Sequence, residues 1–193
     1  MEFAVVLPLL IFLLFGIIDA GRFMWDYNRA EKATAVGARY AVVTDLVPSG
    51  LYDYSFAVND GVTQGDPVPI ANFDSATCDS VTGTCDCVGG NVCDDISYDS
   101  AAFTNIVDHM AAMYPGIQPA NVQIEYKNVG LGYSGDPNGP DVAPLVTVQL
   151  RDVSFQPITC MLFGCSFAMP SFRAALTLED GSNNGLNPPR ADF

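Results

Sequence analysis

The first 22 residues of the chain are MEFAVVLPLLIFLLFGIIDAGR, and residues 3–18 among them carry no charged or strongly polar side chain. A helix over these residues would be about 24 Å long, slightly less than the ~30 Å hydrocarbon core of a bilayer. Apolar and aromatic side chains follow where the membrane surface would lie: Phe23, Met24, Trp25 and Tyr27. The stretch predicts one membrane-spanning helix in contact with lipid. A cleaved secretory signal is less favoured, because no small-x-small site ends the apolar run.

The helix is predicted to continue beyond the membrane. Charged residues of alternating sign recur every three or four positions and would pair along one helical face: Asp19, Arg22, Asp26 and Arg29. Small residues follow at the same spacing and would let another helix approach closely: Ala30, Ala33, Gly37 and Ala41. We therefore predict a transmembrane and assembly helix from about residue 3 to about Asp45. Residues 1–45 form the first domain, and residues 46–193 an exported globular domain.

Composition narrows the classes of function. The chain has 193 residues, with 22 acidic and 8 basic side chains and a formal charge of -14. All of this net charge lies after residue 40, so a nucleic-acid partner is not expected. Hydrophobic residues make up 49% of the chain and the mean hydropathy is +0.23, which excludes a disordered protein.

The N-terminal stretch, together with GARYAVV at residues 37–43, resembles the TadE/TadG-like minor pilins, or pseudopilins, of the tight-adherence (Flp) pilus system. The resemblance implies a pilin-like fold, pilus assembly, and other pilin subunits and the assembly machinery as partners. It also implies cleavage by a prepilin peptidase after a short basic leader, which we expect to be encoded upstream of Glu2. Glu2 and Phe3 match the family's Glu-aromatic pair, and Glu2 would register each subunit against its neighbour. The alternative for Glu2 is an exposed carboxylate stabilised by the helix dipole.

The middle of the chain is acidic and rich in cysteine. Residues 60–99 contain eight Asp and no Lys, Arg, Glu or His, which predicts a solvated loop region; residues 51–58 before it suggest an edge strand. Six cysteines in an exported domain predict full disulfide pairing: Cys78, Cys85, Cys87, Cys93, Cys160 and Cys165. Proximity favours Cys160 with Cys165. Within the loop we slightly prefer Cys78 with Cys93, and rank Cys85 with Cys87 last.

Metal binding is not expected from these residues. The cysteine spacings do not match zinc sites, and no His lies nearby. Residues 136–141 and the group at 94–99 are rich in Asp, but neither matches an EF-hand loop. Turn formation by Asp, Asn, Gly and Pro is the preferred interpretation of both segments.

The rest of the exported domain shows regular periodicity. Residues 100–114 have a helical apolar face and can be capped by Asp99 or Ser100. Residues 121–126, 145–155 and 171–179 alternate as strands, and a change of phase in the second suggests a bulge. One helix against three or four antiparallel strands predicts an α+β domain, with a loose tail over residues 181–193.

No catalytic or cofactor pattern emerges. His109 is the only histidine, and a structural role is expected for it. Residues 132–136 narrowly fail the nucleophile-elbow pattern, because Asp136 stands where Gly is needed. We therefore predict no enzymatic activity and no cofactor. The favoured function is a structural minor pilin in the inner membrane, with an extracytoplasmic domain that is assembled into, or primes, an extracellular pilus. The alternative is a permanently anchored binding or adhesin domain.

Overall fold

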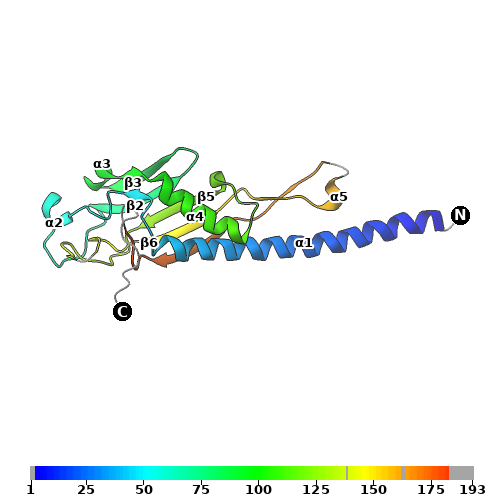
Figure 1. Cartoon of the computed structure of the whole chain (residues 1–193), viewed down its shortest axis with the longest axis horizontal. Coiled ribbons are helices and arrows are strands. Elements are labelled where there is room, and N and C mark those ends of the chain that lie inside the picture. The colour runs from blue at the N-terminus through cyan, green and yellow to red at the C-terminus, as the bar shows by residue number, and fades with distance from the viewer. Residues whose placement is uncertain (1–2, 138, 162–163, 183–193) are drawn as a thin grey trace.

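A long helix projects from one end of an α+β domain in the computed structural model, which describes residues 3–137, 139–161 and 164–182 (Figure 1). The helices are α1 (Phe3–Ala41), α2 (Phe56–Asn59), α3 (Val92–Asp95), α4 (Ser100–Met113) and α5 (Ile158–Met161), with a 3-10 turn at Pro119–Asn121. The strands are β1 (Pro48–Ser49), β2 (Phe73–Asp79), β3 (Thr84–Gly89), β4 (Ser97–Tyr98), β5 (Val122–Lys127), β6 (Leu145–Leu150), β7 (Ser154–Phe155), β8 (Phe167–Ala168) and β9 (Phe172–Thr177). This arrangement confirms the α+β prediction.

A five-stranded sheet forms the centre of the domain, in the order β3-β2-β5-β6-β9 with all neighbours antiparallel. Inward residues alternate along the middle strands and are buried: Val122, Ile124, Tyr126, Val146, Val148 and Leu150. Helix α4 and the C-terminal half of α1 lie side by side over this face (Figure 1). The hydroxyl of Tyr126 accepts a hydrogen bond from the Val47 amide at 3.3 Å, and its burial raises the pKa of Tyr126.

Helix α1 ends at Ala41 rather than at the predicted Asp45. The next residues use their backbone groups in pairing with the C-terminal segment: the amide of Ser182 donates to the carbonyl of Thr44, and the amide of Leu46 donates to the carbonyl of Ser182. Because the carbonyl of Thr44 and the amide of Leu46 bond to Ser182, residues 44–46 pair with the C-terminal segment and do not continue the helix. Ala41, Val42 and Leu46, on the two sides of residue 45, belong to one hydrophobic core, and the division of the chain into domains at residue 45 stays a prediction.

The acidic region at residues 60–99 is not the solvated loop that its composition predicts. It supplies β2 and β3, and its inward residues Phe73, Ala76 and Cys78 are fully buried. Pairing with β5 organises the segment, since Ala76 lies opposite Tyr126 and Cys78 lies opposite Ile124. The segment therefore buries its few apolar residues by pairing with the rest of the sheet, although its own sequence contains too few of them to form a separate core.

Three disulfides join cysteines that are close in sequence: Cys78 with Cys85, Cys87 with Cys93, and Cys160 with Cys165. The last pair confirms the prediction. The preference for Cys78 with Cys93 is wrong, because Cys78 and Cys85 face each other across the β2-β3 hairpin. Pairing Cys78 with Cys93 would also leave Cys85 and Cys87 for each other, which is the pair that was ranked last.

Peptide mapping of nonreduced, exported protein tests this connectivity. We expect all six thiols to be oxidised and three linked peptides, each joining cysteines five to seven positions apart. Each short disulfide loop should stabilise the domain by about 2–3 kcal/mol by restricting the unfolded chain. A Cys78–Cys93 peptide or free thiols would show that the β2-β3 hairpin is stapled differently.

Two further strand predictions change. Residues 51–58 form no strand; they contain the start of α2, and the short strand before them is β1, which pairs with β4. A bulge is expected after Leu150, but the chain instead leaves the five-stranded sheet there, and β7 belongs to a separate two-stranded sheet. Asp152 has a φ of 57°, which turns the chain so that β7 pairs with β8 instead.

The remaining predicted elements are confirmed with small shifts. The carboxylate of Asp99 caps α4 by accepting from the amides of Ala101 at 2.8 Å and Ala102 at 3.0 Å. Strands β6 and β9 lie within their predicted ranges, and β5 begins one residue later and ends one residue later, at Lys127, than the predicted range 121–126. Of the tail predicted to be loose, Gly181 and Ser182 are packed against residues 44–46, and residues 183–193 lie outside the described chain.

Candidate functional site

The N-terminal half of α1 extends away from the domain (Figure 1), and the side chains of residues 6–18 are exposed. We call residues 6–18 the exposed apolar segment. Its large hydrophobic side chains are 37–66% exposed: Val6, Leu7, Leu9, Leu10, Ile11, Phe12, Leu13, Leu14, Phe15, Ile17 and Ile18. A soluble domain rarely leaves so many neighbouring apolar side chains in water. By length and composition α1 is able to cross a membrane, with a mean hydropathy of 2.0 in its most apolar window.

Of Glu2 and Phe3, the Glu-aromatic pair at the start of this helix, the structure describes only the backbone of Phe3. Phe3 is the first residue of α1, so the helix begins at the predicted position. Glu2 lies outside the described residues. Its predicted contact with a neighbouring subunit stays a prediction.

The small-residue stripe packs closely, as its spacing predicts, but its partners lie within the same chain. Ala30, Ala33 and Ala41 are fully buried in the core. A β-carbon built on Gly37 would lie 2.6 Å from the sulfur of Met110 on α4 and 3.4 Å from a methyl group of Val148 on β6. The stripe therefore lets α4 and the sheet approach α1. Packing of the small-residue stripe against a neighbouring subunit stays a prediction. Such packing would require α4 to move away from α1.

The charged face of α1 also binds mainly to the rest of the chain. Asp19 pairs with Arg22 at 3.5 Å, as predicted. Arg29 instead donates to the carbonyl of Met113 at 2.9 Å, and its guanidinium lies 5.9 Å from the ring centre of Tyr114. This contact ties the end of α4 to α1. The alternating charges thus mark where α1 meets its own domain.

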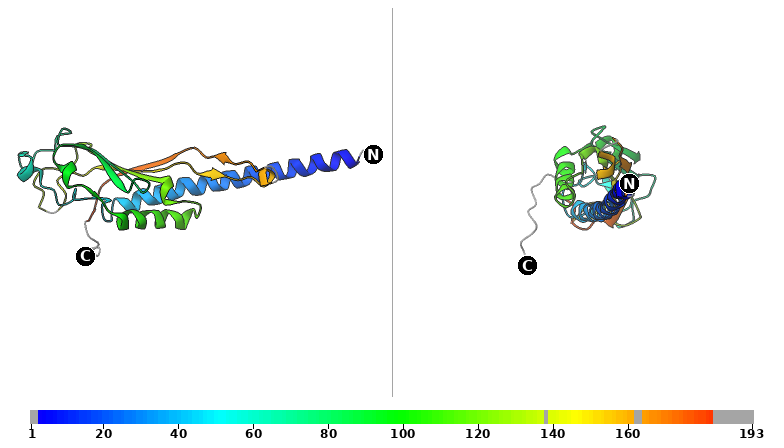
Figure 2. Two further views of the ribbon diagram at one scale, coloured as in Figure 1. Left: turned by 90° about the horizontal axis from the view of Figure 1, so that it is seen from above. Right: turned by 90° about the vertical axis from the view of Figure 1, so that its right-hand side faces the viewer.

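The carboxylate of Asp19 holds a part of the chain that the sequence pattern did not reveal. It accepts hydrogen bonds from the amides of Ile158 at 2.7 Å and Thr159 at 2.9 Å, and from the Thr159 hydroxyl at 2.8 Å. These residues begin α5, at the end of a hairpin built from β7 and β8. We call residues 154–161 together with residues 164–168 the arm. Figure 2 shows the arm running beside α1 toward its N-terminal half.

Aromatic packing secures the base of the arm. The ring of Phe155 meets Phe23 edge-on, with centroids 5.4 Å apart, and the guanidinium of Arg22 lies 5.6 Å from the Phe155 ring centre. Phe155 in turn faces Phe167 across the β7-β8 pair. One signal in the sequence could have located the arm: Val153–Phe172 contains no charged residue, although the domain around it is strongly acidic.

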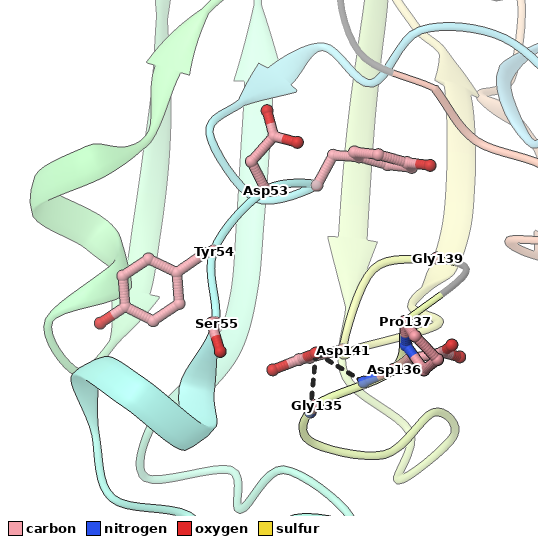
Figure 3. Close-up of a pocket in the computed structure, with 9 residues that line it drawn as sticks. Asp53, Tyr54, Ser55, Gly135, Asp136, Pro137, Gly139 and Asp141 are labelled. Carbon is pink, nitrogen blue, oxygen red and sulfur yellow. Dashed lines mark hydrogen bonds between the residues drawn. The ribbon is translucent and has the colours of Figure 1, made fainter.

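An open hollow of about 420 Å³ lies at the end of the domain remote from the N-terminus. Residues 52–55 form one wall, and the other wall consists of Gly135, Asp136, Pro137, Gly139 and Asp141 (Figure 3). The Asp141 carboxylate joins these walls, since it accepts from the amides of Phe56 at 2.8 Å, Gly135 at 2.9 Å and Asp136 at 3.2 Å. Asp141 therefore organises the turn, in agreement with the preferred interpretation of residues 136–141.

Neighbouring polar groups at this end are likewise used in structure. The Tyr54 hydroxyl donates to Asp60 at 3.3 Å, and Asn91 donates to the same oxygen at 2.8 Å. Burial, together with the charge of Asp60, raises the pKa of Tyr54 to about 12, so the hydroxyl keeps its proton at neutral pH. Within residues 3–137, 139–161 and 164–182, no group of three or more His, Cys, Asp or Glu side chains is placed to hold a metal ion.

His109 has a packing role. Its ring centroid lies 3.8 Å from that of Tyr40, where α4 crosses α1. This placement agrees with the structural role expected for it. The single histidine thus contributes to the contact between the two main helices.

Comparison with known proteins finds a family match at the N-terminal end of the chain. No curated protein and no solved structure is detectably similar to the chain. The family model described as TadE-like protein matches residues 1–39, about a fifth of the length. The match ends two residues before α1 does and covers both the exposed apolar segment and most of the buried half of the helix. Residues 1–39 of this chain are therefore a TadE-like segment.

Proposed function

We propose that the protein is a structural minor pilin, held in the inner membrane by residues 3–18 and assembled into, or priming, a tight-adherence pilus. Its domain would lie on the extracytoplasmic side. The observation that carries this proposal is the exposed apolar segment, which lies inside the TadE-like segment and contacts little of the domain. A TadE-like segment and an exposed apolar helix fit a membrane-anchored, pilus-associated protein, and the family is structural rather than enzymatic.

The exposed apolar segment suits two environments in turn. In a bilayer the backbone groups of the helix are hydrogen-bonded within the helix, and its large apolar side chains contact the lipid acyl chains at little energetic cost. In a filament the same side chains would pack against the helices of neighbouring subunits. One segment could therefore serve first as anchor and then as assembly surface, while the buried half of α1 holds the domain to it.

Glu2 would fix the register of that assembly. A carboxylate that leaves water in an apolar bundle is costly unless a cation pairs with it. No Lys or Arg precedes Arg22, so the chain offers no nearby basic side chain of its own. The free amine at the N-terminus of a neighbouring subunit is the partner that we propose, in line with the role implied by the family resemblance.

Replacing Glu2 by Ala tests this role. We expect normal membrane abundance and a normally folded domain, but at least a tenfold loss of the protein from sheared pili, because an unpaired amine would remain buried. The measurement is quantitative blotting of membrane and pilus fractions. Glu31→Ala is the control, since Glu31 is an exposed carboxylate farther along α1.

The second candidate function is a permanently anchored binding or adhesin domain. One observation favours it: the small-residue stripe is occupied by α4 and the sheet, so it does not by itself indicate contact between subunits. Normal incorporation into pili and normal adherence in the Glu2→Ala strain would leave α1 as a simple tether and favour this alternative.

A further inference from the structure

We propose that the arm is a second membrane contact, which rests its exposed side chains Ile158 and Phe167 on the lipid headgroup layer beside α1. The inference rests on the proposed function, because it requires residues 3–18 to span the bilayer. It adds a lipid-binding surface on a part of the chain that lies more than a hundred residues away in sequence. The occupant of this surface is the bilayer itself.

The hydrogen bonds of Asp19 set the height of the arm. They hold Ile158 and Thr159 at the height of Asp19 along α1. Asp19 directly follows Ile18, the last residue of the exposed apolar segment. Phe155 packs on Phe23, four residues farther along α1 and roughly 6 Å higher at 1.5 Å per residue. The headgroup layer is about 5–7 Å thick on each side of the hydrocarbon core. Ile158, Thr159 and Phe167, which pairs with Phe155, therefore lie within this layer.

The surface of the arm suits that position. Val153–Phe172 contains no charged residue, in a chain whose formal charge is -14. An anionic membrane repels the acidic domain but not this run. Phe167 is 57% exposed and Ile158 is 36% exposed, whereas Phe155, which pairs with Phe167, is buried and packs on Phe23. Met24 and Trp25, also exposed, follow Phe23 on α1 and continue this belt just above the headgroup layer.

The arm is also fixed firmly enough to act on the domain. Three hydrogen bonds to Asp19 hold its α5 end, and the Cys160–Cys165 disulfide closes the chain there. The amide of Met169 donates to the carbonyl of Val153 at 2.7 Å and closes the base of the hairpin. Contact at both α1 and the arm would limit the tilt and rotation of the domain on the membrane. A single helix without the arm would leave both free.

Tryptophan fluorescence of the full chain in vesicles tests the proposal. In a Trp25→Phe background, one new tryptophan replaces Ile158, Phe167 or, as the control, Val58, which is 80% exposed on α2 at the remote end of the domain. The probe is a phosphatidylcholine and phosphatidylglycerol vesicle containing lipids spin-labelled at the headgroup or along the acyl chain. Circular dichroism and disulfide mapping verify that each variant is folded.

We expect the headgroup label to quench Ile158→Trp and Phe167→Trp about threefold or more above Val58→Trp. The acyl-chain label should quench Ile158→Trp more than Phe167→Trp, because Ile158 lies lower. Quenching of both arm positions at the level of Val58→Trp, with the protein floating with vesicles, overturns the arm contact and leaves the anchor standing. A blue-shifted emission that depends on protein concentration but not on the lipid label assigns the arm to a second copy and also overturns it. Failure to float overturns both the anchor and this inference.

Discussion

Placing arginine at both Leu10 and Leu13 should remove the protein from the membrane. The two residues lie in the middle of the exposed apolar segment and are 49% and 62% exposed, so neither substitution disturbs the core. An arginine at the centre of a membrane helix costs about 2.5–3.5 kcal/mol on insertion scales. Two of them oppose insertion by roughly 5–7 kcal/mol, which exceeds what a short span can tolerate. Alkaline extraction of membranes, followed by blotting, measures the effect.

The matched control is Val58→Arg with Val81→Arg. Both valines are exposed on the domain, at 80% and 68%, and the double change adds the same charge. We expect the control protein to stay in the extracted membrane pellet, and the Leu10→Arg/Leu13→Arg protein to be lost from it almost completely. Equal retention of both proteins would mean that the exposed apolar segment does not span the bilayer.

Gly37→Leu should destabilise the domain rather than act only on assembly. Even a β-carbon at this position would lie 2.6 Å from the sulfur of Met110, and Met110 is itself fully buried. A leucine must therefore push α4 away from α1 or distort the core. Overpacking of this kind typically costs 1–3 kcal/mol, and we expect about 3 kcal/mol here because both helices are held by other contacts. Denaturant unfolding of the full chain in detergent measures the change.

Gly21→Leu provides the comparison. Gly21 lies on the same helix, and nothing is within 4 Å of the position where its β-carbon would be. This substitution should leave the free energy of unfolding unchanged or raise it slightly, because leucine favours helix over glycine. If Gly37→Leu unfolds like the native protein yet fails to enter pili, the stripe contacts other subunits and its packing against α4 is not essential.

Periodic segments of this protein could be predicted from sequence, because their burial follows their own residues. The helical spacing of apolar residues in α4 indicates one buried face, and so does the alternation of apolar and polar residues in β5 and β6. The start of α1 and its capacity to cross a membrane, which its length and composition give it, follow from an uninterrupted apolar run. In these cases the local pattern and the tertiary environment agree.

Segments that depend on distant partners were missed. Strands β2 and β3 carry three Asp, and two of their three buried residues, Ala76 and Cys78, are small, so the segment resembles a loop until β5 pairs with β2. Even the aspartates serve the hairpin: Asp79 accepts from the amides of Val81 and Thr82 at its turn. The bonds from Thr82 keep the pKa of Asp79 below its usual value although partial burial opposes them.

The candidate site shows the same division. The exposed apolar segment was predictable, because its composition alone excludes water as its natural surroundings. The partners of the stripe and of the charged face were not, since spacing along a helix shows which residues share a face but not whether the same chain covers it. Asp19 illustrates this: the carboxylate binds Ile158 and Thr159, 139 and 140 residues away.

We propose that the exposed apolar segment leaves the bilayer to pack against other subunits. Photo-crosslinking in cells distinguishes this packing from simple anchoring, with a photoreactive amino acid at Leu13 and, as the control, at Val58. We predict that the Leu13 protein from sheared pili forms adducts with another pilin subunit, whereas the Leu13 protein from membranes that do not assemble pili forms none, and the Val58 protein forms none in either fraction. Normal membrane abundance of the Leu13 protein, with no adduct and no protein in sheared pili, would contradict the claim.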